Sequence, residues 1–102
     1  MTAGSLQYKN ITGAATTTLV AANQTGGNSQ GVLHCITIQK VSAQTITVYD
    51  GDATTGTVIA TLPASAATGS YFYDCVVTKG LTIVTAASYA GDLTISYQPG
   101  LA

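Results

Sequence analysis

Apolar and polar side chains alternate along most of the chain with a period of two residues. In residues 44–50, for example, Ile46 and Val48 alternate with threonines. This period is that of a β-strand with one buried face, and Thr, Ile and Val suit the pleated backbone. No segment has the 3.6-residue apolar stripe of a helix. The pattern predicts strands at residues 5–11, 15–22, 32–41, 44–50, 57–62, 71–78, 81–86 and 92–97.

These strands predict an all-β, single-domain antiparallel β-sandwich of about eight strands, jelly-roll-like or Ig-like. Residues 15–22 also contain the alanines of a helix, but three consecutive threonines disfavour one. The domain is expected to span 1–102, with terminal arms at 1–7 and 98–102. The longest connections, 23–30 and 63–70, are expected to be loops.

Charged residues make up only 7% of the chain, against about 25% in an ordinary soluble domain. The chain contains three lysines, four aspartates and no Arg or Glu, with a net charge of −1. Three scattered lysines cannot form a basic stripe for nucleic acid or a polybasic membrane site. No apolar run is long enough to span a membrane, and the N-terminal segment does not resemble a secretory signal.

So few charges leave a weak electrostatic barrier to association. We therefore expect much of the surface to be covered by a partner or by copies of the same chain. The alternative is a soluble monomer whose surface is hydrated by Thr, Ser, Gln and Asn.

His34, Cys35 and Asp74 are the residues that suggest a thiol nucleophile with a base. His34 and Cys35 are adjacent on one predicted strand, so their side chains should point to opposite faces. His34 is expected on the core-facing row that contains Ile36, at the sheet margin or as a satisfied polar group. This geometry argues against catalysis.

The same alternation places Leu33 and Cys35 on the outer face. Because Asp74 is unlikely to be buried, Cys75 is expected to face inward. One outward and one inward thiol cannot form a disulfide, so both cysteines are expected to be free.

Asp50, Gly51 and Asp52 resemble a cation-binding loop, but calcium needs six to eight oxygen ligands and the rest of that pattern is missing. A turn is the preferred interpretation. The chain has no carboxylate pair for acid–base catalysis and no glycine-rich nucleotide cradle. We therefore expect no enzymatic activity, no cofactor and no metal.

Six tyrosines carry most of the aromatic area, and tyrosine suits both cores and interfaces. Half of them are assigned to the core. Tyr8 and Tyr97, near the termini, and the outward-facing Leu33 and Phe72 are the main interface candidates. The full set of expected partner-binding residues is Leu6, Tyr8, Leu33, Phe72, Tyr97 and Leu101.

Six segments of the chain share a strand and turn pattern: YKNITG (8–13), GVLHCITI (31–38), TITVYDG (45–51), YD (73–74), GLTIVT (80–85) and DLTISY (92–97). These segments resemble small β-sandwich virion proteins of tailed bacteriophages, including head decoration or cement proteins. Together they cover nearly the whole chain. Strand and turn patterns of this kind do not distinguish head proteins from neck or tail proteins.

The resemblance implies a homotrimer that binds the major capsid protein of the same phage on the outside of the assembled head. Such a protein is made in the host bacterial cytoplasm and resides in the virion. It would bind no nucleic acid, membrane or small-molecule substrate. Two alternatives stay open: a phage neck or tail component, and a carbohydrate-binding module that uses exposed tyrosines.

Overall fold

The computed structural model describes residues 6–20 and 30–99. In these ranges the chain forms eight strands and no helix, which confirms the all-β prediction. The strands are β1 (Gln7–Ile11), β2 (Ala15–Val20), β3 (Gly31–Lys40), β4 (Ile46–Asp50), β5 (Thr57–Leu62), β6 (Gly69–Val77), β7 (Leu81–Thr85) and β8 (Asp92–Pro99). None of the described residues forms a helix that could span a membrane.

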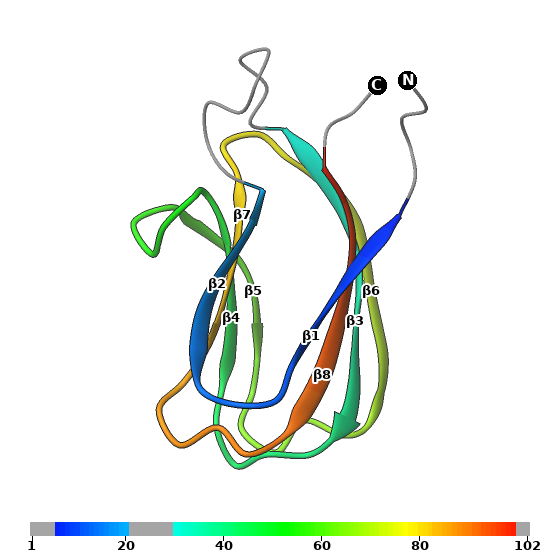
Figure 1. Ribbon diagram of the computed structural model, residues 1–102, viewed down its shortest axis with the longest axis vertical. Coiled ribbons are helices and arrows are strands. Elements are labelled where there is room, and N and C mark those ends of the chain that lie inside the picture. The colour runs from blue at the N-terminus through cyan, green and yellow to red at the C-terminus, as the bar shows by residue number, and fades with distance from the viewer. Residues whose placement is uncertain (1–5, 21–29, 100–102) are drawn as a thin grey trace.

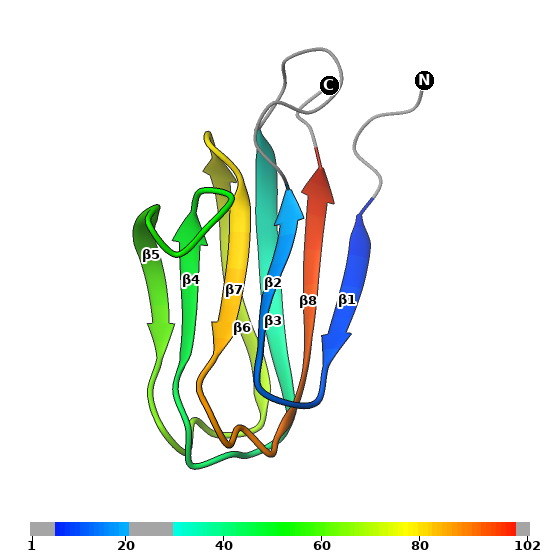
Figure 2. The same ribbon diagram turned by 60° about the vertical axis from the view of Figure 1, so that its left-hand side comes forward.

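The strands form two four-stranded antiparallel sheets packed face to face (Figures 1 and 2). We name sheet A by its order β1-β8-β3-β6 and sheet B by its order β2-β7-β4-β5. Apart from the β4–β5 hairpin, every connection crosses from one sheet to the other. This is the strand order of a jelly roll, which decides between the two sandwich types expected.

The predicted terminal arms are partly wrong. Gln7 already pairs with Tyr97 in sheet A, and β8 continues through Gln98 to Pro99. Residues 1–5 and 100–102 lie outside the described residues, as does most of the predicted loop 23–30. The predicted loop 63–70 is shorter, because β6 already begins at Gly69, and it is anchored where Ser65 N donates to Ser42 O at 2.8 Å and Ala66 packs against the core.

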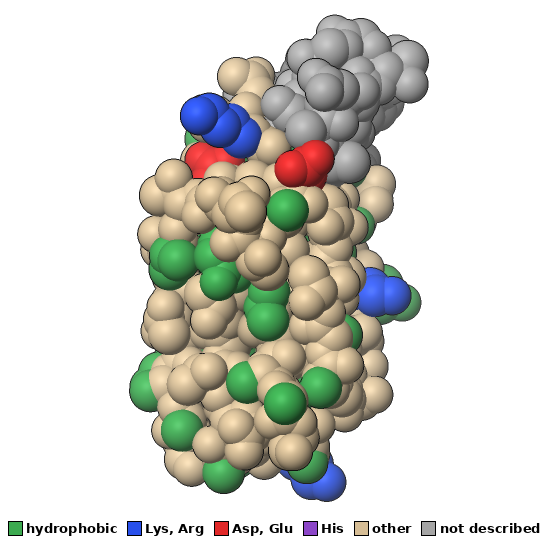
Figure 3. Space-filling view, turned by 90° about the vertical axis from the view of Figure 1, so that its left-hand side faces the viewer, with side chains coloured by type: hydrophobic (Ala, Val, Ile, Leu, Met, Phe, Trp, Pro, Cys, Tyr) green, Lys and Arg blue, Asp and Glu red, His purple; other side chains and the backbone are tan. Residues whose placement is uncertain are grey.

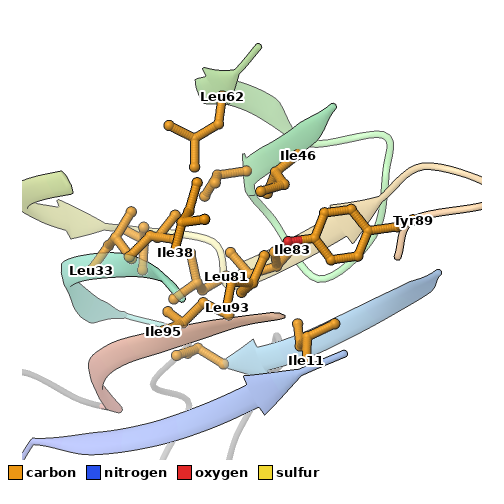
Figure 4. Packing of buried hydrophobic residues seen from close by; sticks show 14 residues of the cluster. Ile11, Leu33, Ile38, Ile46, Leu62, Leu81, Ile83, Tyr89, Leu93 and Ile95 are labelled. Atoms are coloured by element: carbon orange, nitrogen blue, oxygen red, sulfur yellow. The ribbon is translucent and has the colours of Figure 1, made fainter. Parts of the chain in front are cut away.

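The core is a single, largely aliphatic layer between the two sheets that also contains Tyr89 (Figure 4). Inward-facing Ile and Leu side chains from sheet A, such as Ile36 and Ile95, are fully buried. Ile83 and Val48 face them from sheet B and are also fully buried. The alternation that predicts the strands therefore also predicts which side of most strands is buried.

Leu33 and His34 are the exceptions: the outward-facing position predicted for Leu33 and the core-facing position predicted for His34 are both wrong, although His34 is the satisfied polar group given as one alternative. Leu33 has no exposed surface, and His34 is half-buried with its ring beside the exposed Phe72 ring. The cause is a β-bulge: the β3 register shifts between Leu33 and Cys35 against both neighbouring strands. An extra residue reverses the alternation, so Leu33 and Ile36 both face the core.

Asp50 joins the end of β4 to the turn between β6 and β7, and so links sheet B to sheet A. Its carboxylate accepts hydrogen bonds from Thr78 N at 3.0 Å and Lys79 N at 2.8 Å. It also accepts one from the Thr78 hydroxyl at 3.2 Å. The Asp50–Asp52 segment is thus a structural turn, as expected. Among the described residues, no group of three or more metal-ligating side chains is found.

Gly80 completes this connection. It has φ +132°, a conformation that side chains rarely adopt, and its carbonyl accepts a hydrogen bond from Gly51 N at 3.2 Å. A Cβ at this position would lie 2.7 Å from the Val20 carbonyl oxygen. The close approach of three chain segments therefore requires glycine here.

Asp50→Ala should lower the free energy of unfolding by about 1–3 kcal/mol, because backbone N–H groups lose a charged acceptor. Asp50→Asn should lower the free energy of unfolding by less, since the amide keeps one acceptor oxygen. Urea denaturation followed by circular dichroism measures both. Equal stability of Asp50→Ala and the wild type would contradict the role given to this carboxylate.

Leu33→Ala should lower the free energy of unfolding by about 2–5 kcal/mol, because it leaves a cavity in the core. Phe72→Ala, on the outer face of the neighbouring strand, should change it by less than about 1 kcal/mol. The same denaturation experiment compares the two. If Leu33→Ala lowered the free energy of unfolding less than Phe72→Ala, Leu33 would be on the outer face, as the regular alternation without a bulge predicts.

Candidate interaction face

The structure brings two of the six predicted interface residues to one surface. Tyr8 pairs with Ser96 and Phe72 pairs with Cys35, while Ser96 and Cys35 pair with each other. Directly opposed residues of antiparallel strands share a face. Tyr8, Ser96, Cys35 and Phe72 therefore form one row across the outer face of sheet A. Its two ends are three strand spacings apart, roughly 14 Å.

The rings at the ends of this row are well exposed: Tyr8 by 76% and Phe72 by 64%. The residues between them are small, and Cys35 is buried. In the next row, Val32 pairs with Val76, which is 54% exposed. We call Tyr8, Val32, Phe72 and Val76 the outer apolar patch. Apolar side chains left uncovered together on one face are typical of an interaction site.

The other predicted interface residues have different positions. Leu33 is in the core, and Tyr97 packs against the core from β8. Leu6 is 53% exposed and directly precedes β1. Leu101 lies outside the described residues. Sequence reasoning missed Val76, although its alternation with the inward-facing Cys75 already places it on the outer face.

His34 and Asp74 form a hydrogen-bonded pair between the two rows of the patch. His34 Nδ1 lies 2.5 Å from Asp74 Oδ1, and the imidazole meets the Phe72 ring edge-on at 5.5 Å between centroids. Asp74 has φ +48°, so the β6 side of the bulge turns this carboxylate toward the histidine. The Asp74 side chain is 63% exposed, so the pair contributes little stability. Its effect is to fix the orientation of the imidazole beside Phe72.

The outer face of sheet B differs from that of sheet A. Thr47 pairs there with Thr61 and Val84, and Thr18 bonds to the Thr82 hydroxyl. Figure 3 shows small, separated apolar groups on this side, with charged side chains near its ends and margin. The Thr82 hydroxyl also donates to the Gly51 carbonyl at 2.8 Å, which further closes one end of the face. The exposed aromatic rings of Tyr8 and Phe72 thus lie on sheet A, whereas the exposed large apolar side chains of sheet B are the aliphatic Val58 and Ile59.

Both cysteines are free thiols on opposite sides of sheet A. Cys35 faces outward in the row with Phe72, and Cys75 packs against the core, as the alternation predicts. Partial burial and the nearby Asp50 carboxylate raise the pKa of the Cys75 thiol. A raised pKa disfavours the nucleophilic thiolate. The bulge places His34 and Cys35 on the same face, so the expectation of opposite faces is wrong for this pair.

Comparisons with known proteins bear on the fold alone. No protein-family model matches the chain, and no match is found among curated proteins. A solved structure with a similar fold comes from Bacillus endospore appendages, which form a family of disulfide-linked pili. It is 17% identical, with a TM-score of 0.53, and the match covers 96% of this chain and 87% of that chain. The protein is therefore a small two-layer β-sandwich that shares its fold with a pilus protein.

Both thiols should react slowly with Ellman's reagent in the folded protein and rapidly in denaturant. Cys35 is 7% exposed, and the raised pKa of Cys75 lowers its thiolate fraction. Absorbance at neutral pH, with and without guanidinium, measures the two rates. Detection of fewer than two thiols in denaturant without reductant would contradict the free state of the cysteines.

Proposed function

We propose that the protein is a structural subunit that binds the outside of an assembled bacteriophage head as a decoration or cement protein. The observation that carries the proposal is the outer apolar patch on sheet A. The jelly-roll fold, common among viral capsid proteins, is consistent with it. The resemblance of several strand segments to phage virion proteins supports a place in the virion, and head decoration proteins are among the proteins that they resemble.

The patch has the composition of a protein-binding surface. An aromatic ring stands at each end, the residues between the rings are small, and Val32 and Val76 extend the apolar area. Aromatic side chains dominate binding energy at protein interfaces, and charged side chains are depleted from interface centres. Asp74 lies on β6 between Phe72 and Val76, and its carboxylate is hydrogen-bonded to the His34 imidazole.

A cement protein stabilises a shell by mass action. It binds the assembled head and not the free capsid protein, so each bound copy favours the assembled state. The stabilising effects of many copies on one lattice add up, and no covalent bond is needed. The mechanism requires a rigid domain with a complementary face, which a jelly roll with its patch supplies.

Two matched valines on opposite sheets test which face binds. Val76 on β6 is 54% exposed and Val58 on β5 is 51% exposed. Val76→Asp should weaken binding to heads by about tenfold or more, because it places a charge in the interface. Val58→Asp should leave binding unchanged. Co-sedimentation with heads of the phage that encodes the chain measures affinity, and heat release of DNA measures stabilisation.

Equal binding by both variants would show that the patch is not the contact. Failure of the wild-type protein to bind heads would overturn the proposed function. Binding of that protein to a glycan array, abolished by Tyr8→Ala, would then favour the carbohydrate-binding alternative. Its presence only on isolated tails would favour a tail or neck component.

A filament subunit is the second candidate, because the fold is similar to that of a protein from Bacillus endospore appendages. Those appendages are disulfide-linked, whereas Cys35 is buried in this chain and Cys75 faces the core. A filament of this protein should therefore resist reducing agents. Electron microscopy of the concentrated protein, with and without reductant and without heads, tests this candidate.

A further inference from the structure

Strand β1 is the edge strand with the most regular backbone. The two sheets have four edge strands, β1, β2, β5 and β6. The ladders of β2, β5 and β6 each contain a register shift against the neighbouring strand. The β1–β8 ladder has none, from Gln7–Tyr97 to Ile11–Leu93. Bulges protect edges against pairing with other chains, so β1 is the edge that lacks this protection.

The part of β1 before Ile11 is not covered on either face by the rest of the described structure, whereas Ile11 is buried in the core. Gln7, Tyr8, Lys9 and Asn10 are all exposed, although they alternate between the two faces of sheet A. On the inner side, an open groove of about 260 Å³ is lined by residues 9–15 and Thr17, which include the start of β2. Figure 1 shows β1 diverging from β2 above their connection. The strand thus has one hydrogen-bonded neighbour and one free edge.

We propose that β1 pairs antiparallel with β1 of a second copy of this chain, with Tyr8 opposite Tyr8 of the second copy. This pairing extends sheet A into the sheet of the second copy across a two-fold axis. The inference does not depend on the proposed attachment to heads. The β1–β1 pairing forms a dimer, whereas the resemblance to phage proteins implies a trimer.

The side chains of β1 select this register. Opposed residues of antiparallel strands share a face, so a two-fold axis at a residue keeps outer faces together. An axis at Lys9 would oppose two ammonium groups, which is unfavourable. An axis at Tyr8 opposes two aromatic rings and places Lys9 opposite the Gln7 amide. Aromatic pairs across strands are among the favourable ones.

The same register explains why a second copy fits better than an unrelated partner. Tyr8 belongs to the outer apolar patch, so the axis joins the two patches on one continuous sheet face. Lys9 is the single charge among Gln7–Ile11, so the two copies repel each other weakly. Pairing of five residues buries less than the roughly 1,200 Å² of a standard interface, so the isolated dimer should dissociate readily.

Cross-linking at Tyr8 tests the register. In a Cys35→Ser, Cys75→Ser background, Tyr8→Cys should form a covalent dimer under mild oxidation, because opposed Cα atoms lie about 4.5–5.5 Å apart. Asn10→Cys is the matched control on the same face. Its new thiol would lie opposite Leu6 of the second copy, about four residues or 13 Å from the equivalent thiol of that copy. We expect the Tyr8→Cys dimer to form about tenfold faster, measured on non-reducing gels.

A measurement on the unmodified protein covers the case in which the serine background is unstable. Amide hydrogen exchange in β1 should slow as protein concentration rises, while exchange in β5 stays constant. Cross-linking as fast at Asn10→Cys as at Tyr8→Cys would overturn the register. Concentration-independent exchange in β1, or a trimer by light scattering, would overturn the pairing. None of these outcomes depends on the effect of Val76→Asp on head binding, so the pairing and the proposed function are tested separately.

Discussion

The packing of two aliphatic sheet faces against each other is the constraint on which the rest of the structure depends. The chain has few charges, and its described part contains no helix, metal cluster or disulfide. Burial of Ile and Leu side chains between sheets A and B is therefore the main source of stability. The β3 bulge serves this packing, because it keeps both Leu33 and Ile36 in the core. Its consequence on the other side is that His34 and Cys35 share the outer face.

Most of the fold was predictable from the sequence because it follows from local rules. Alternating Thr and Ile residues define the strands, and Asp50 and Gly80 mark turns. The β-bulge was not predictable, since an extra residue has no signal in an alternating pattern until the partner strands are known. The wrong sheet faces predicted for Leu33 and His34 both follow from that bulge. The jelly-roll order was also beyond local rules, because it is set by pairing between distant strands.

The candidate site was predictable only in part, for a related reason. Tyr8 and Phe72 are exposed by alternation, but their common row depends on β8 and β3 lying between their strands. Residue type alone does not tell an exposed tyrosine from one that packs against the core. Tyr8 is on the outer face of sheet A, whereas Tyr97 is on its inner face and packs against the core. Exposure of a single side chain is thus a local property, whereas a patch is a property of topology.

The polar interactions differ between the two sheets. Asp50 and Thr82 fasten loops over one end of sheet B, and the Thr85 hydroxyl donates to Gly13 O at 2.7 Å. On sheet A, the hydrogen-bonded pair of His34 and Asp74 lies among apolar groups that stay uncovered. Bulges interrupt the ladders of three edge strands, while the regular β1 edge borders the same apolar face. Because a free edge and an uncovered face meet at Tyr8, both can be covered by neighbours without any change in the fold.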